Sequence, residues 1–157
     1  MTNLEKKDWT NKLSIGNINI DNDHKRLLEV YNDLVDLIEL NGNREEFAKI
    51  LSKMTDYSLK HFEKEENYMQ EFAYPKLTEH KQYHRNYIYK VAMYNVDLLS
   101  SNPPKPIEII KFLEKWWINH IMNIDADYEN YKKKNELPRG RASRYRVTRK
   151  ITAIDFC

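Results

Sequence analysis

Apolar residues recur three or four positions apart in four long stretches of the chain, separated by polar residues. This spacing predicts four amphipathic helices, each with one buried face. The expected helices begin near Asp21 or Asn22 and end at Gly42, follow Asn43 and end at Pro75, begin at Leu77 and end near residue 98, and extend from about Pro106 to about residue 135.

The connections between these stretches are short, so consecutive helices should be antiparallel. Three glycines and five prolines in 157 residues are too few for a sandwich or barrel, which needs turn residues every ~8 to 12 positions. We therefore predict an all-α, up-down-up-down antiparallel four-helix bundle as a single domain over residues 1–136. Its first 20 residues lack a clean helical period and should form an arm laid over the bundle.

The composition is typical of a soluble globular protein, with 41% hydrophobic and 32% charged residues. Cys157 is the single cysteine, which favours a reducing compartment. The N-terminus has no apolar signal region, and no apolar run reaches the ~18 residues of a membrane span. We expect a cytoplasmic protein without a membrane span; the sequence indicates no oligomeric state.

Residues 137–157 form a basic C-terminal extension that differs in charge from the rest of the chain. They contain six Lys and Arg against one acidic residue, whereas residues 1–136 contain 20 Lys and Arg against 23 Asp and Glu. Such a run is usually a solvated tail, and the alternative is weak electrostatic docking on an acidic surface. Tyr145 is the only aromatic residue among the basic ones, so we expect no specific nucleic-acid binding.

Five polar residues stand on the inward stripes where leucine would be expected. Two pairs are four residues apart, His61 with Glu65 and His80 with His84, so each pair shares a helix face and can chelate one ion. A buried carboxylate without a partner costs several kcal/mol, and nitrogen and oxygen donors without thiolates favour iron, manganese or zinc. On an exposed face the same pairs would only stabilise a helix. The fifth residue is His120.

The residues that carry this pattern resemble the hemerythrins, specifically single-domain bacterial hemerythrins, over about residues 9–131. Each segment alone is a weak signal, but all five in order supply seven potential ligands. The segments are Ile-Asp-Asn-Asp-His at 20–24, His-Phe-Glu-Lys-Glu-Glu-Asn-Tyr-Met at 61–69, Tyr-Pro at 74–75, His-Lys-Gln-Tyr-His at 80–84, and Trp-Trp-Ile-Asn-His-Ile-Met-Asn-Ile-Asp at 116–125.

The resemblance implies two Fe ions joined by an oxo or hydroxo bridge. It assigns His24 and His61 to one iron, and Glu65 and Asp125 as bridges between both. Three bridging ligands and three histidines would saturate one iron, whereas two histidines would leave one position open at the other, where hemerythrins bind O2. By the same resemblance the other iron takes His80, His84 and His120.

The resemblance also implies an apolar O2 pocket that lacks a proton donor and so favours reversible binding over oxygenation. Hemerythrins usually have leucine at the mouth of this pocket, at the position of Trp117 in this sequence. We therefore expect Trp117 to change the pocket volume and the escape of ligands. The predicted pocket residues are Leu27, Phe62, Trp116, Trp117 and Ile121.

The implied function is reversible, non-enzymatic O2 binding for storage, delivery or buffering. The alternative is a redox or gas sensor in which the same site, binding O2 or NO, signals to a partner. Ferritin-like enzymes use Glu-x-x-His motifs, and no glutamate stands three residues before any histidine here. A single zinc would leave three or more ligands unused, and a metal-free bundle would leave buried carboxylates uncompensated.

The spacing of His120 and Asp125 raises a geometric question. Residues five apart on a regular helix are separated by about 140°, so they cannot point at one metal pair. Either a π-helical widening lies between them, or Asp125 reaches sideways.

Overall fold

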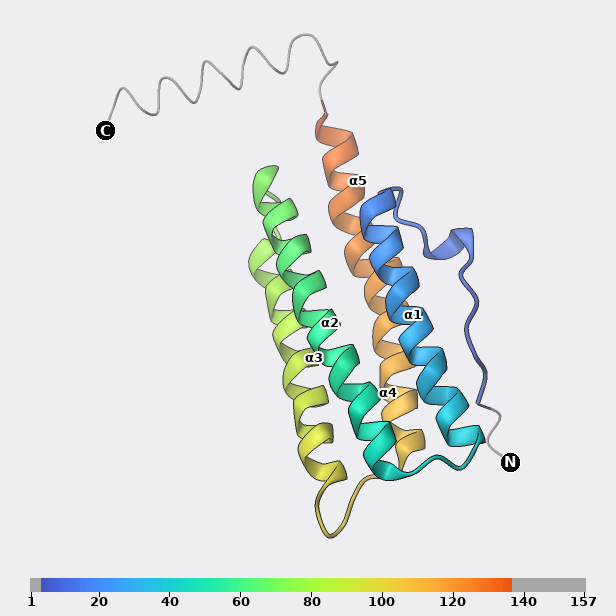
Figure 1. The fold of residues 1–157 in the computed structure, drawn as a ribbon. Helices are drawn as coiled ribbons and strands as arrows, with labels where there is room; N and C mark the ends of the chain where they lie inside the picture. Colours follow the sequence, from blue (N-terminus) through green and yellow to red (C-terminus); the bar gives the residue numbers. More distant parts are fainter. Residues whose placement is uncertain (1–3, 137–157) are drawn as a thin grey trace.

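The computed structural model describes residues 4–136, which form an antiparallel four-helix bundle (Figure 1). The prediction of an all-α bundle is confirmed. The predicted extension at 137–157 lies outside the described residues. The bundle consists of α1 (Ile18–Glu39), α2 (Arg44–Glu71), α3 (Leu77–Leu98), and a fourth rod made of α4 (Pro106–Asn119), the π-helical segment η2 (His120–Asp125) and α5 (Ala126–Asn135).

The first helix begins three residues before the predicted cap at Asp21. The side chain of Asn17 accepts hydrogen bonds from the backbone N–H groups of Asn19 and Ile20 and so caps α1. At the other end the helix stops at Glu39 rather than at Gly42. The predicted boundaries of this helix were therefore wrong by about three residues at each end.

The remaining helices begin close to their predicted positions. Asn43 caps α2 by accepting a hydrogen bond from the backbone N–H of Glu46 at 2.8 Å, and Pro106 is the first residue of α4, where its missing N–H costs nothing. The helix α2 ends at Glu71, four residues before Pro75, because Ala73 adopts a left-handed backbone with φ of 53°.

Asp21 holds the N-terminal arm instead of capping a helix. Its carboxylate accepts hydrogen bonds from the Ser14 hydroxyl at 2.5 Å and the Ile15 backbone N–H at 2.9 Å. Further along the arm, the backbone of Lys7 exchanges two hydrogen bonds of 2.8 Å with the side chain of Asn32 on α1. The arm includes the short 3-10 helix η1 (Asn11–Leu13), and it lies along the bundle as predicted.

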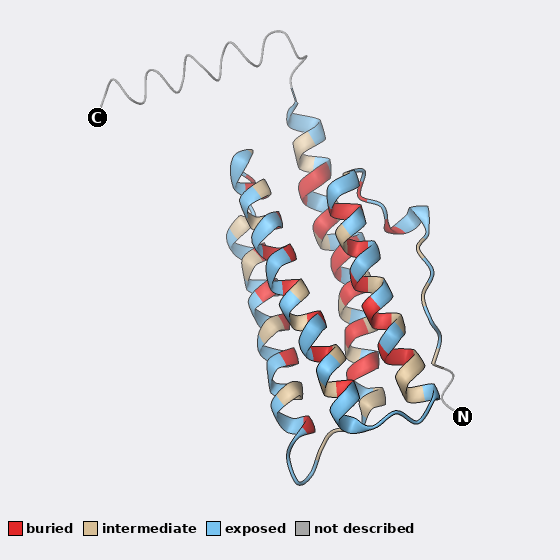
Figure 2. Cartoon of the chain, viewed as in Figure 1, coloured by how far each residue is buried: buried red, intermediate tan, exposed pale blue. Residues whose placement is uncertain are grey.

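The core contains polar as well as apolar side chains. Buried positions line the inward faces of the helices over their whole length (Figure 2). All five histidines lie among them, each 1% or 2% exposed, and so do the fully buried Glu65 and Asp125. No helix among residues 4–136 combines the length and hydrophobicity that a membrane span requires.

Candidate metal centre

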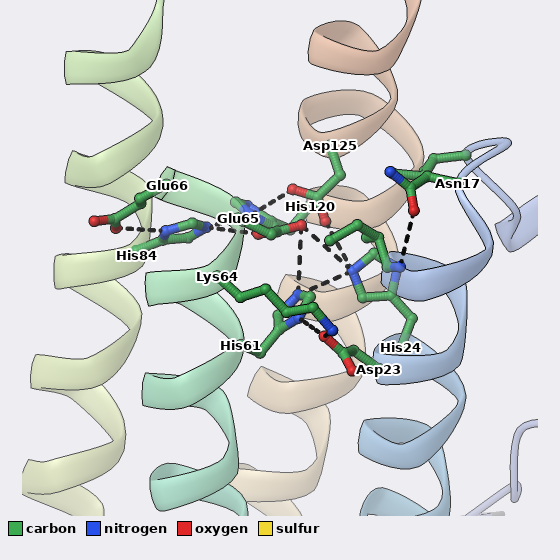
Figure 3. A network of polar contacts seen from close by, with 12 residues as sticks. Asn17, Asp23, His24, His61, Lys64, Glu65, Glu66, His84, His120 and Asp125 are labelled. Atoms are coloured by element: carbon green, nitrogen blue, oxygen red, sulfur yellow. Dashed lines mark hydrogen bonds and ion pairs between the residues drawn. The ribbon is translucent and has the colours of Figure 1, made fainter. Parts of the chain in front are cut away.

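Seven side chains from all four rods of the bundle meet in its interior (Figure 3). They form two groups that share both carboxylates: His24 and His61 belong to one group, and the three remaining histidines belong to the other. The shared residues are Glu65 and Asp125, and the larger group is completed by His80, His84 and His120. The structure therefore brings together every ligand that the resemblance implied, in the same two-and-three division.

The segment η2 explains how His120 and Asp125, five residues apart, can face the same point. His120 and Asp125 are its first and last residues, and its hydrogen bonds are of the π type, which adds one residue to the turn. The widened turn brings both side chains inward, so that His120 Nε2 lies 3.0 Å from Asp125 Oδ1. Of the two alternatives for this spacing, the π-helical widening is confirmed.

Each carboxylate directs its two oxygens at different histidines. Oε1 of Glu65 lies 3.4 Å from His61 Nε2, whereas its Oε2 lies 3.3 Å from His84 Nε2. Asp125 repeats the arrangement, with Oδ2 at 3.1 Å from His24 Nε2 and Oδ1 at 3.1 Å from His80 Nε2. This is the arrangement of a carboxylate that bridges two metal ions.

The spacing of the donor atoms fits metal ligation. Nε2 of His24 and Nε2 of His61 are 3.1 Å apart, as are those of His84 and His120. A metal ~2.1 Å from two nitrogens at a right angle would hold them about 3 Å apart. The site can therefore accept two ions with little rearrangement of its side chains.

Several buried polar atoms of the site lack hydrogen-bond partners among the described residues. They include both oxygens of Asp125, Oε2 of Glu65 and Nε2 of His80. Leaving such atoms buried and unpaired is costly, and a pair of cations would satisfy these four at once. Nδ1 of His24 and Nδ1 of His80 also lack partners, but they are not the nitrogens that face the cluster. The donor set and its unpaired atoms thus fit a di-metal centre.

Two further carboxylates, which the sequence did not single out, hydrogen-bond to histidines of the cluster. Asp23 Oδ2 accepts a hydrogen bond from Nδ1 of His61 at 3.0 Å, and Glu66 Oε1 accepts one from Nδ1 of His84 at 2.9 Å. The Nδ1 proton fixes each ring, so Nε2 is the nitrogen left for a metal. Asp23 also binds Lys64 Nζ at 3.0 Å. Their only signal in the sequence was their position next to the ligands His24 and Glu65.

A buried tyrosine completes the surroundings of the bridging glutamate. The hydroxyl of Tyr128 donates a hydrogen bond of 2.9 Å to Oε1 of Glu65. Burial, together with the charge of Glu65, raises the pKa of Tyr128 well above its ordinary value, so the phenol stays protonated and remains a donor.

Without a metal ion, protons on the neighbouring histidines offset the negative charge of Glu65 and Asp125. Burial would lower the pKa of His61, but the charge of Glu65 raises it to about 10. Burial likewise opposes the charged form of Glu65, yet the neighbouring histidines hold the pKa of this carboxyl well below its usual range. Burial lowers the pKa of His120 despite the nearby Asp125. Positive charge is therefore required at this site, and metal ions would displace protons to supply it.

A small cavity adjoins the group with two histidines. Leu27, Trp117 and Ile121 line it next to His24, and the arm residue Trp9 completes its wall. The centre of a water-sized molecule can occupy about 20 Å³ within it, so the cavity has room for about one diatomic ligand. The surface that faces the cavity is almost entirely apolar, as expected, although Lys7, Tyr31 and Glu114 are among the residues that border it.

The other two predicted pocket residues stack on ligands and do not line this cavity. Phe62 lies 3.8 Å from the ring of His84 with an 8° angle between the planes, and Trp116 lies 4.2 Å from the ring of His120 at 14°. Trp117 is held by a hydrogen bond of 3.0 Å from its indole N–H to the hydroxyl of Tyr87.

Comparisons with known proteins agree with this geometry. The Hemerythrin HHE cation binding domain matches residues 16–131. Bacteriohemerythrin of Clostridium acetobutylicum is 30% identical over 76% of this chain and 96% of its own length, and bacteriohemerythrin of Pseudomonas aeruginosa (strain PAO1) is 33% identical over 76% and 77%. A crystal structure of wild-type hemerythrin superimposes with a TM-score of 0.73 at 27% identity, over 79% of this chain and 95% of its own. The chain belongs to the hemerythrin HHE cation-binding family.

Proposed function

We propose that this chain binds O2 reversibly at a di-iron centre and serves in oxygen storage, delivery or buffering. Hemerythrin domains bind a di-iron centre, and the two groups of donors in this chain can hold one. A bound iron pair would supply the two electrons that O2 takes up on binding and returns on release. The observation that carries the proposal is the division of both carboxylates between two unequal sets of histidines.

The proposed ligand roles follow from the distances within the cluster. His80, His84 and His120 would hold one iron, and His24 and His61 the other, with Glu65 and Asp125 bridging. The group with two histidines supplies one protein ligand fewer than the other group. The cavity adjoins His24, a member of that smaller group, which supports this side of the site as the position for O2.

The residues around the cavity would favour binding over catalysis. Leu27, Trp117 and Ile121 surround the space at His24 with apolar groups, which disfavours water beside a bound ligand. The cavity is too small for an organic substrate. Lys7 and Glu114, the charged side chains in its wall, are paired with each other at 2.8 Å, so neither presents an unpaired charge to a ligand.

The proposal is tested by loading the iron-free chain with Fe(II) under anaerobic conditions. We expect two irons per chain, one for each group of ligands, and an absorption band that appears with O2 and disappears when O2 is removed. The same chain loaded with zinc is the control and should stay colourless. An iron content of one or none, or a band that cannot be reversed by removing O2, would contradict the proposal.

A further inference from the structure

The five histidines of the cluster differ in what separates them from solvent. The ring of His120 lies flat against Trp116, which is half-buried, and 6.2 Å from the ring of Tyr83, which is 45% exposed. Among the described residues, His120 is the histidine of the cluster that lies next to partly exposed aromatic rings. The aromatic rings next to the other four histidines are all buried: Phe62, Trp117 and Tyr128.

This difference matters because an oxygen carrier can lose its electrons. If the proposed function is right, a ferric pair cannot bind O2 until two electrons reach it from outside. The histidine ligands are at most 2% exposed, so a donor cannot touch them directly. Electron tunnelling weakens steeply with distance, so a partly exposed ring that packs on a histidine of the cluster shortens the path from a donor at the surface.

We propose that Trp116 and Tyr83 form the site at which an external one-electron donor reduces the iron pair, through the ring of His120. Two donor molecules each lose one electron, the two irons each gain one, and no bond of the chain is made or broken. The aromatic rings mediate tunnelling and are not themselves oxidised. The inference rests on the proposed function and adds to it a route for reactivation.

The arrangement would keep the site of electron entry apart from the site of O2 binding. The cavity lies beside His24 on α1, whereas Trp116 and Tyr83 flank His120 between α3 and the fourth rod. Figure 3 shows His24 and His84 approaching the bridging Glu65 from opposite sides of the bundle. A donor at Tyr83 would therefore not block the space proposed for O2.

The test measures how fast reduced methyl viologen delivers electrons to the ferric, iron-loaded full chain in an anaerobic stopped-flow experiment. Trp116→Leu should slow reduction by about an order of magnitude, whereas Trp116→Phe, which keeps a ring against His120, should restore most of the rate. Tyr83→Leu should slow it several-fold. The matched control is Tyr89→Leu, which removes a tyrosine of α3 that is 70% exposed and has no contact with the cluster.

Three further measurements keep the outcome interpretable. Iron content, midpoint potential and the rate of azide binding should be unchanged in Tyr83→Leu, because this ring does not stack on His120. The midpoint potential of the Trp116 variants is measured as well, because Trp116 stacks on His120, and their reduction rates are compared at equal driving force. Rates equal to that of the unaltered chain, or an equal loss in Tyr89→Leu, would overturn the inference and leave the proposed function intact. If Trp116→Leu loses iron, the reduction rate of Tyr83→Leu tests the inference, because Tyr83 is exposed and its replacement should leave the iron site intact. A chain that takes up no iron would overturn both proposals together.

Discussion

Asp23 and Glu66 should control how tightly the chain holds its two irons. Asp23 accepts a hydrogen bond from Nδ1–H of His61 at 3.0 Å, and Glu66 accepts one from Nδ1–H of His84 at 2.9 Å. In the proposed assignment these two histidines bind different irons. Changing such a partner typically lowers metal affinity by roughly 10- to 100-fold, which is about 1.4 to 2.7 kcal/mol. Asp23→Asn keeps an acceptor oxygen and should fall near the lower figure, whereas Asp23→Ala should approach the upper one.

The structure also predicts how a neighbour modulates this effect. Lys64 shares the same oxygen of Asp23 at 3.0 Å, but its side chain is 49% exposed, so solvent screens the pair. Lys64→Met should therefore change iron affinity far less than Asp23→Asn. Glu63→Gln, at an exposed position of the same helix, is the control for Glu66→Gln because it alters the same charge without touching a ligand.

The assay is an anaerobic competition for Fe(II) between the chain and a coloured chelator, followed by iron counting. Asp23→Asn and Glu66→Gln should each weaken one of two binding steps, and the double variant should weaken both. If these variants hold iron as tightly as Glu63→Gln does, the Nδ1 hydrogen bonds have no energetic role at the metal and our reasoning about ligand orientation is refuted.

Four other predictions concern the site itself. Glu65→Gln or Asp125→Asn should lower iron occupancy or speed autoxidation far more than Glu63→Gln, because each removes charge shared by two cations; equal effects in iron assays would remove the bridging role. Trp117→Leu should raise both association and dissociation rates of O2 in flash photolysis while iron content stays the same; unchanged rates would show that this ring does not restrict the ligand. The pKa of His61 is raised to about 10, so protonated His61 stabilises the iron-free chain fully below the ordinary histidine pKa. This stabilisation is lost as pH rises through about 10, and denaturant midpoints of the iron-free chain should fall over this range. Binding of a metal must displace that proton, so metal affinity should rise with pH over the same range, and a pH-independent affinity would contradict the proton displacement.

The helices and five of the seven candidate ligands could be predicted from local spacing, whereas His24 and Asp125 were implied only by the resemblance to hemerythrins. The inward stripe of the second helix, for example, placed His61 and Glu65 on the buried face, and both are buried. Helix boundaries depended instead on contacts with residues outside the helix. Asn17 and Asp21 are both good caps by type, but Asp21 is engaged by the arm, so Asn17 caps the helix.

The orientation of the fourth rod was predicted only in part. A regular helix would place Ile124, four residues after His120, on the inward face, but Ile124 is half-buried whereas Asp125 is fully buried, because the π turn changes the helical phase. Asp23 and Glu66 looked like ordinary surface charges, since nothing in their spacing distinguishes a carboxylate that faces solvent from one that faces the back of a histidine ring.

The π turn at His120–Asp125 makes the residue count and the helix type of this segment depend on each other. Five residues reach around a widened turn, whereas a regular α-helix brings residues four apart to one face. If the segment relaxed to a regular α-helix at its present length, every side chain beyond it would rotate by about 100°, which carries Asp125 and Tyr128 away from the centre together. Deletion of one residue at positions 121–124 would instead leave His120 and the aspartate four residues apart, so a regular helix could keep both side chains on the inward face. A bundle built from regular helices could copy all seven ligands and still fail to bring them to one point.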